Sequence, residues 1–333
     1  MPRRDASPAA ALVRERYVRM LRTALGPVIA GLLDEEDVTD VLLNPDGKLW
    51  VGRLGTGRSA TGTELSPADA ERIVRLVASH MGFEVHRERP MIEAELPETG
   101  ERFHGALPPV ASQPTFAIRK PAARIYPLAD YISGGIMTAF QAGYLRQAVW
   151  ARKNILIAGG TGGGKTTLAN ALLLIVAETG HRVVILEDRR ELQCAAADVV
   201  ALRTKPGVVS LADLVRLTLG FWPDRIVVGE FRGGEALDLL KAWGTGHPGG
   251  IATMHANTAA STMVQLEQLL LERVVTIPRA LIAEAIDVVV WIGATGGRRR
   301  VETIAELRGF RDGIYDLRPI ETAGAPLASG MTS

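Results

Sequence analysis

A glycine-rich segment near the middle of the chain constrains the fold more than any other feature. Residues 159–166 read Gly-Gly-Thr-Gly-Gly-Gly-Lys-Thr and fit the pattern G-x-x-x-x-G-K-[ST]. An apolar run at 154–158 precedes the motif, and a helical pattern at 166–177 follows it. A strand, a glycine-rich turn and a helix in this order predict a phosphate-binding loop, because backbone N–H groups and the positive end of the helix dipole converge on one anion.

Two side chains of this motif would carry its chemistry. Lys165 would neutralise the β- and γ-phosphates of a nucleotide, and the hydroxyl of Thr166 would ligate Mg²⁺. The motif alone does not separate kinases, GTPases, helicases and motors. The residues that we expect to bind the nucleotide are Gly159, Gly160, Thr161, Gly162, Gly163, Gly164, Lys165, Thr166 and Thr167.

Strand and helix patterns alternate through the part of the chain that contains the motif. Further short apolar runs lie at 182–186, 225–228, 251–254 and 288–292, with helical patterns between them. This alternation predicts an α/β domain at 138–320, with a mostly parallel sheet and helices on both faces.

The first 120 residues have a different pattern. It predicts a smaller α+β domain, with a helix at 11–33 interrupted near Gly26-Pro27, a helix opened by Ser66-Pro67, and short strands. We expect a linker at 121–137 and a disordered tail at 321–333. The expected strands of this first domain lie at 41–43, 49–51, 102–107 and 116–119.

Composition excludes several classes of protein. The 333 residues carry 38 Lys and Arg against 37 Asp and Glu, so the net charge gives no general argument for nucleic acid or an anionic membrane. The single cysteine, Cys194, excludes a disulfide framework and fits a reducing, cytoplasmic compartment. No apolar run approaches the length of a membrane span, and the basic N-terminus lacks the apolar core of a signal peptide, so we expect the protein to begin near Met1.

Three acidic residues follow the predicted strands. Glu187 and Asp188 come directly after one strand, and Glu230 follows another, so all three face the edge of the sheet that carries the phosphate loop. We expect Glu187 or Glu230 to polarise an attacking water, and Glu230 or Asp188 to join Thr166 in holding Mg²⁺. The alternative is that these acids cap helices or pair with Arg189, Arg190 and Arg232. The guanine-specificity pattern N-K-x-D is missing from the sequence, which argues against a GTPase.

Two histidines flank the predicted strand at 251–254. His255 stands at its carboxyl end, where it would sense the γ-phosphate. His247 precedes the strand and would either sense the nucleotide or support the loop structure. A metal site would require further His or Cys ligands, which the sequence does not supply nearby.

The ordered motifs resemble those of the secretion and type IV pilus ATPase family and, within it, the TrbB-type conjugal transfer ATPases. Besides the phosphate loop, residues 185–192 are similar to the family's Asp box, 225–236 to its atypical Walker B motif and 245–258 to its His box. The resemblance runs from about Val38 to about Leu317. It implies a RecA-like P-loop ATPase domain that binds ATP and Mg²⁺, preceded by a PAS-like domain.

The resemblance also implies roles for the N-terminal domain and for the whole protein. Arginines at the positions of Arg102 and Arg119 are expected to reach the nucleotide that the C-terminal domain binds; the alternative is that both are ordinary solvated strand residues. Family members form hexameric rings. The implied function is an ATP-hydrolysing motor for DNA or protein transfer and pilus assembly in a conjugative type IV secretion system. Its partners would be inner-membrane channel components, with peripheral membrane contact and no sequence-specific nucleic acid.

Two other classes of function compete with this one. A RecA-like DNA helicase or packaging ATPase would use the basic run at 298–300 to touch phosphate, although a solvated hairpin explains that run as well. A scaffold that binds ATP without hydrolysing it would not need Glu187 and Glu230.

Overall fold

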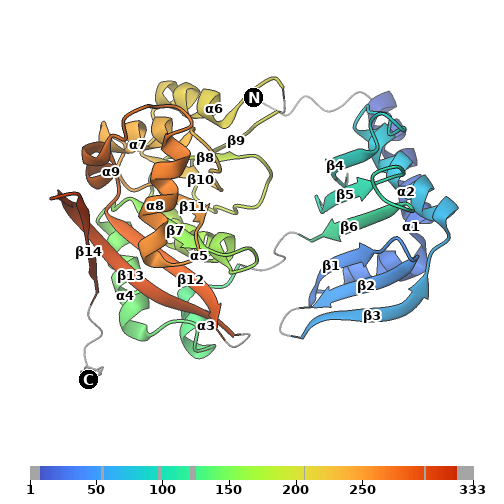
Figure 1. The fold of residues 1–333 in the computed structure, drawn as a ribbon, viewed down its shortest axis with the longest axis horizontal. Helices are drawn as coiled ribbons and strands as arrows, with labels where there is room; N and C mark the ends of the chain where they lie inside the picture. The colour runs from blue at the N-terminus through green and yellow to red at the C-terminus, as the bar shows by residue number, and fades with distance from the viewer. Residues whose placement is uncertain are drawn as a thin grey trace. The chain divides into compact units, whose positions relative to one another are not determined.

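The protein consists of two compact units in a computed structural model that describes residues 8–53, 56–96, 100–120, 125–205, 207–295 and 298–320. The units are Met1–Ala123 and Arg124–Ser333, and each has its own sheet and core (Figure 1). The expected tail at 321–333 lies outside the described residues.

The first unit is built on a six-stranded antiparallel sheet. The order of the strands is β3-β2-β1-β6-β5-β4. The four predicted strands are present. The exposed strand β3 was not predicted because its residues lack an apolar alternation, and β4 was missed although Ile92 and Ala94 alternate with Glu93 and Glu95. The strands are β1 (Val38–Leu43), β2 (Lys48–Arg53), β3 (Gly57–Glu64), β4 (Met91–Glu95), β5 (Arg102–Ala106) and β6 (Thr115–Arg119).

Two helices pack on this sheet and bury its apolar side chains. In α1 (Pro8–Asp34), Gly26 breaks the helical geometry with φ 72° just before Pro27, as the sequence predicts. In α2 (Pro67–His80), the Ser66 hydroxyl accepts a hydrogen bond from the backbone N–H of Asp69 and begins the helix. The shared core includes Ile29, Val41, Ile73, Val74, Phe103 and Ile118.

The second unit has an eight-stranded sheet in the order β14-β13-β12-β7-β11-β10-β8-β9. Neighbours from β12 to β9 are parallel, and β12-β13-β14 is an antiparallel meander. Asp312 and Gly313 take positive φ between β13 and β14, as a tight hairpin turn requires. The strands are β7 (Ile155–Gly159), β8 (Val183–Glu187), β9 (Val199–Arg203), β10 (Arg225–Val228), β11 (Ile251–His255), β12 (Val288–Thr295), β13 (Arg298–Arg311) and β14 (Ile314–Pro319).

Helices cover both faces of this sheet. On one face α3 (Leu128–Ser133), α4 (Ala139–Trp150) and α5 (Lys165–Ala177) form a core with Ile155, Ile157 and Ile185. The alternate strand residues Leu156, Ala158 and Leu186 face the other core. That core is formed by α6 (Leu211–Thr218), the 3₁₀ turn η1 (Leu219–Phe221), α7 (Ala236–Gly244), α8 (Ala259–Leu270) and α9 (Arg279–Ala285).

The expected linker at 121–137 is wrong in its second half. Residues 128–133 form α3, and Tyr131 and Met137 are buried in the core beside α4 and α5. Two prolines, Pro121 and Pro127, suggested a linker, but Pro127 instead stands at the N-cap of the helix, a position that tolerates proline because no intrahelical N–H is needed there.

Candidate functional site

The glycine-rich loop connects the end of β7 to the start of α5, as predicted. Gly164 stands at the N-cap of α5 with φ 97°, a conformation that side chains with a Cβ rarely adopt. Gly159 has no room for a side chain for another reason: a Cβ there would lie 2.2 Å from the backbone oxygen of Ile292 in β12. The loop therefore rests directly on the backbone of the neighbouring strand.

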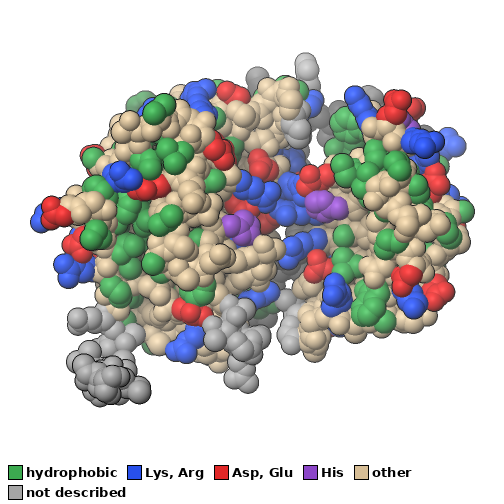
Figure 2. Space-filling view, viewed as in Figure 1, with side chains coloured by type: hydrophobic (Ala, Val, Ile, Leu, Met, Phe, Trp, Pro, Cys, Tyr) green, Lys and Arg blue, Asp and Glu red, His purple; other side chains and the backbone are tan. Residues whose placement is uncertain are grey.

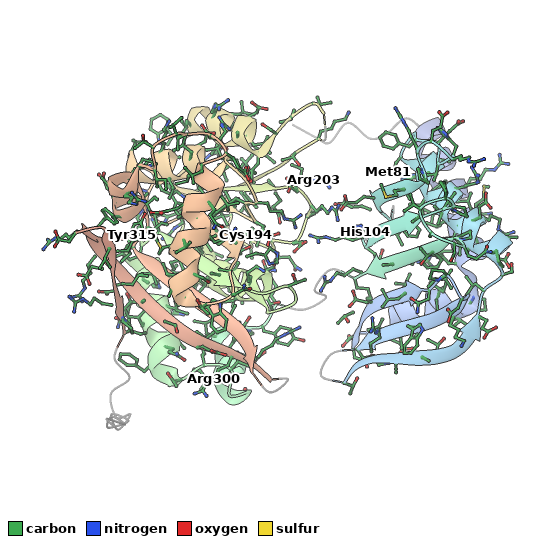
Figure 3. All side chains as sticks on the ribbon, in the orientation of Figure 1. Met81, His104, Cys194, Arg203, Arg300 and Tyr315 are labelled. Carbon is green, nitrogen blue, oxygen red and sulfur yellow. The ribbon has the colours of Figure 1, made fainter. Side chains whose placement is uncertain are left out.

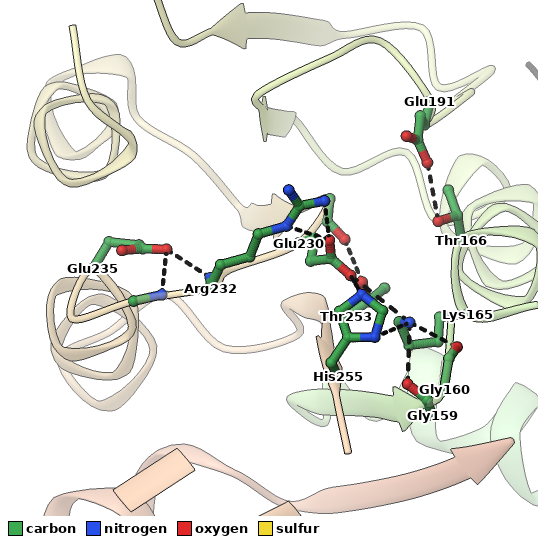
Figure 4. Close-up of polar contacts among 12 residues, drawn as sticks. Gly159, Gly160, Lys165, Thr166, Glu191, Glu230, Arg232, Glu235, Thr253 and His255 are labelled. Atoms are coloured by element: carbon green, nitrogen blue, oxygen red, sulfur yellow. Dashed lines mark hydrogen bonds and ion pairs between the residues drawn. The ribbon is translucent and has the colours of Figure 1, made fainter. Parts of the chain in front are cut away.

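Lys165 is buried at the centre of the site. Its ammonium donates hydrogen bonds of 3.1 Å to the backbone oxygens of Gly159 and Gly160 (Figure 4). It also lies 3.8 Å from Glu230 Oε1 and 3.3 Å from His255 Nδ1. The cation is thus fixed beside the loop, with an acid and an imidazole next to it.

His255 bridges Lys165 and Glu230, and its partners determine its tautomer. The ammonium of Lys165 can only donate, so Nδ1 of His255 accepts from it. The proton of the neutral ring is therefore on Nε2, which lies 3.1 Å from Glu230 Oε1 and donates to it. Burial lowers the pKa of His255 below its ordinary value, Lys165 and Arg232 lower it further, and Glu230 opposes them. The ring is neutral near pH 7.

Glu230 follows β10, and both of its oxygens are engaged. Oε1 faces Lys165 and His255, and Oε2 accepts a hydrogen bond of 2.6 Å from Arg232 Nε. The Arg232 backbone N–H is in turn held by Glu235 Oε1 at 2.8 Å. A carboxylate bound in this way has a defined direction, which a general base requires.

Glu191 is a site residue that the sequence reasoning missed. Its Oε2 accepts a hydrogen bond of 3.2 Å from the hydroxyl of Thr166, the predicted Mg²⁺ ligand (Figure 4). Asn170 of α5 donates to the Glu191 backbone oxygen and accepts from the Gln193 backbone N–H, which fixes the segment after β8 against α5. The sequence feature that could have identified Glu191 is its position within the Asp box, three residues after Asp188.

The two acids at the end of β8 point to other partners. Glu187 is buried, and its Oε1 accepts from the backbone N–H groups of Glu191 and Leu192 at 2.9 and 2.7 Å. Asp188 is exposed and accepts a hydrogen bond from the Thr204 hydroxyl. Glu187 therefore shapes the loop that carries Glu191, and among the described residues Asp188 accepts from Thr204 rather than from Thr166.

The two predicted histidines lie at opposite ends of β11. His255 is at the carboxyl end with the phosphate loop, whereas His247 Nδ1 lies 3.1 Å from the backbone oxygen of Pro223, beyond the amino end. Because that oxygen can only accept, His247 donates to it. His247 has the loop-supporting role that the sequence left as an alternative. Figure 2 shows basic, acidic and histidine side chains close together on the surface of the second unit.

Arg102 and Arg119 lie in the first unit and face each other across β5 and β6. They are directly paired in the antiparallel register, on the sheet face that does not bury Phe103 and Ile118. His104 shares this face (Figure 3). Its pKa is lowered by burial first and then by the two arginines. Like charges paired across strands are unfavourable on their own, and here Asp40, Glu93 and Glu95 of the neighbouring strands lie opposite Arg119, His104 and Arg102.

The donors near the loop fit a magnesium ion that is shared with a nucleotide. The described residues contain no group of three or more His, Cys, Asp and Glu that would hold a metal by themselves. Mg²⁺ in nucleotide sites needs fewer protein ligands, because phosphates and water complete its shell. The Thr166 hydroxyl and the Glu191 carboxylate are hard oxygen donors of the required type.

None of the helices that the structure describes is both long enough and apolar enough to cross a bilayer.

Comparisons with known proteins agree with the architecture and the motifs. The family model described as type II/IV secretion system protein matches residues 63–292. The conjugal transfer protein TrbB of Rhizobium radiobacter is 46% identical over 302 residues, which cover 90% of this chain and 93% of that protein. The type IV secretion system protein PtlH of Bordetella pertussis is 35% identical, with 85% and 93% covered.

A solved structure shares the fold. The pilus retraction motor PilT has a TM-score of 0.59 and 22% identity, covering 89% of this chain and 83% of that one. The matched family model and the TrbB relative confirm the resemblance that the four motifs predicted, and the chain belongs to the type II/IV secretion system protein family.

Proposed function

We propose that the protein is an ATP-hydrolysing hexameric motor that energises a conjugative type IV secretion system at the cytoplasmic face of the inner membrane. The observation that carries this proposal is the cluster of Lys165, His255 and Glu230 beside the phosphate loop. The names of the TrbB and PtlH relatives support the biological setting.

In this proposal the loop binds the phosphates of ATP. Backbone N–H groups of the loop and the amino end of α5 hold the β-phosphate, and Lys165 compensates the charge of the β- and γ-phosphates. Thr166 and Glu191, with Glu230 or Asp188 through water, would hold Mg²⁺, which supplies further charge stabilisation at the phosphates when it is bound. The remaining residues of the motif, Thr161 and Thr167 among them, line the same turn.

We assign the general base to Glu230 rather than to Glu187. Glu230 Oε1 lies within 3.8 Å of Lys165 and 3.1 Å of His255, so it faces the side of the loop where the γ-phosphate would sit. Glu187 instead binds two backbone N–H groups and positions the Glu191 segment. His255 donates to Glu230, orients it, and links its position to that of Lys165.

Arg102 and Arg119 are proposed to respond to the γ-phosphate in the assembled ring. Support comes from their direct pairing across β5 and β6, which brings two arginines together on one face, with Asp40 and Glu95 opposite them in the neighbouring strands. Arg119 Nε lies 3.6 Å from Asp40 Oδ1, and His104 Nδ1 lies 3.8 Å from Glu93 Oε1 on the same face. An arginine that reaches a transferring phosphoryl group contributes about 10³ to 10⁵ in rate.

The decisive test is ATP turnover by Lys165→Ala. We expect no measurable turnover, because removal of this cation leaves the phosphate charge uncompensated, while Lys241→Ala on the exposed side of α7 serves as the matched control. Turnover near that of the wild type in Lys165→Ala would refute the mechanism.

The assembly and its setting need separate measurements. Mass photometry with a non-hydrolysable ATP analogue should detect a six-membered particle, and a monomer that hydrolyses ATP at the full rate would contradict the ring. Stimulation of turnover by single-stranded DNA with a steep salt dependence would instead favour the helicase or packaging alternative.

A further inference from the structure

The phosphate loop has two flanks, and the residues described so far occupy only one of them. The loop follows β7, whose neighbours in the sheet are β11 on one side and β12 on the other. His255 ends β11, and Glu230 follows β10, so Lys165 and its partners lie on the β11 side. A nucleotide with its γ-phosphate on that flank places its α-phosphate and nucleoside toward β12 and β13.

Arg299 stands on this second flank. It pairs with Ala294 across the hairpin of β12 and β13. Its Cδ lies 3.6 Å from the position that a Cβ on Gly164 would take, next to Ile292 Cδ1 at 3.5 Å. The side chain is exposed, and in the part of the chain that the structure describes no hydrogen bond or ion pair holds its guanidinium. The aliphatic stem thus lies along the last glycine of the loop, with the charged end beyond it.

The strand that carries Arg299 is anchored to the rest of the unit. Val301, two residues on, is buried, and its backbone N–H donates to the Ile136 oxygen at 2.7 Å, which fixes the hairpin to the segment after α3. Nearby, the hydroxyl of Tyr131 is buried and has no hydrogen-bond partner among the described residues. The charge of Arg299 lowers the pKa of Tyr131, although burial raises it overall. A rigid support reduces the entropy that an arginine loses on binding.

We propose that Arg299 is a nucleotide-binding residue that contacts the α-phosphate, on the flank of the loop opposite to Lys165. The proposal rests on the proposed function, because it places ATP in the loop. The planar guanidinium suits two oxygens of one phosphate. Since ATP and ADP share the α-phosphate, Arg299 binds both equally and does not take part in hydrolysis.

The test compares Arg299→Gln with Arg300→Gln. Side chains alternate along a strand, so Arg300, which is labelled in Figure 3, lies on the face of β13 opposite to Arg299 and provides a matched control. In Arg299→Gln we expect the KM for ATP and the Kd for ADP to rise together by about 10-fold. The kcat should stay within about twofold of wild type, because the lost contact is equally strong in the bound substrate and in the transition state. Arg300→Gln should leave all three unchanged, and circular dichroism should show both variants folded.

Several results would overturn the inference. Loss of kcat, or weaker binding of ATP alone, would place Arg299 at the γ-phosphate. Equal effects in Arg300→Gln would mean a general charge effect, and unchanged ADP affinity in Arg299→Gln would remove the contact altogether. A wild-type protein that binds no nucleotide would refute the proposed function and this inference together, whereas normal wild-type binding with an unaffected Arg299 variant refutes only the inference.

Discussion

At the scale of single residues, the site separates two glutamates that the sequence could not rank. Both follow parallel strands, and strand ends alone place them at the same edge of the sheet. The difference comes from the side chains: Glu230 faces Lys165, and Glu187 turns back to two backbone N–H groups of its own loop. The partners of a side chain depend on loop geometry, which no periodic pattern of residues encodes.

This assignment predicts different effects of two isosteric substitutions. Glu230→Gln should reduce kcat by about 10² to 10⁴, because an amide cannot accept the proton of water, and should preserve ATP binding. Glu187→Gln keeps an oxygen that accepts both N–H groups and should lose much less. Single-turnover hydrolysis and nucleotide binding measure both effects. A larger loss in the Glu187 variant would reverse the assignment.

His255 makes the site sensitive to acid. The pKa of His255 lies below its ordinary value in the folded protein, so folding favours the neutral ring. Above the ordinary pKa of histidine the ring is neutral, and its hydrogen bonds in the site are fully formed. As the pH falls through the lowered pKa, protonation of Nδ1 removes the acceptor of Lys165, and kcat/KM should fall. His255→Gln should be less active at pH 8 and lack this acid limb. An identical pH profile in the variant would exclude His255 as its origin.

At the scale of helices and strands, sequence patterns identified most elements of the second unit. The apolar runs gave β7, β8, β10, β11 and β12, since strands buried on both faces are apolar throughout. The edge strand β9 was missed although its sequence Val-Val-Ala-Leu-Arg is mostly apolar, and the structure shows it only partly buried. Helix α4 was also missed: Gly143 and a weak separation of polar from apolar residues hide its helical periodicity.

Arg225 joins several elements of the second unit, although matching the Walker B motif assigns it no role. It is fully buried at the start of β10, where it donates to the backbone oxygens of Val149 and Gly249 and to His181 Nδ1. It thereby connects α4, β10 and the loop before β11. Burial lowers its pKa to about 10. Apolar runs predict the strand but not the cation within it.

Loss of Arg225 should therefore destabilise the second unit. Arg225→Met leaves buried carbonyl oxygens without donors, and we expect a loss of about 2–4 kcal/mol in the free energy of unfolding. Arg311→Met, at an exposed position on β13, is the control and should change little. Urea titration followed by circular dichroism measures the difference. Equal stability of the two variants would show that these hydrogen bonds are not needed.

At the scale of the whole molecule, the apolar core of the first unit shares no residue with the cores of the second unit. Ile73 is fully buried in the first unit and Leu172 in the second. Each unit should therefore have its own unfolding transition. Ile73→Ala should lower the stability of the first by about 2–5 kcal/mol through the cavity that it leaves. Calorimetry of Ile73→Ala and Leu172→Ala should shift different transitions. A single transition that both variants lower equally would show that the units unfold together.

The contact between Gly159 and β12 has a consequence for tolerance to substitution. Motif matching attributes every glycine of the loop to the ligand, yet position 159 is closed by the Ile292 oxygen, 2.2 Å from where a Cβ would be. An alanine there would push β12 away from β7, so the protein would be lost to misfolding. At Gly160 and Gly162 a Cβ meets open space, and Gly162 is restricted by its positive φ alone. A mutational scan scored separately for abundance and for ATP turnover would therefore divide one motif into glycines required by the sheet and glycines required by the phosphate.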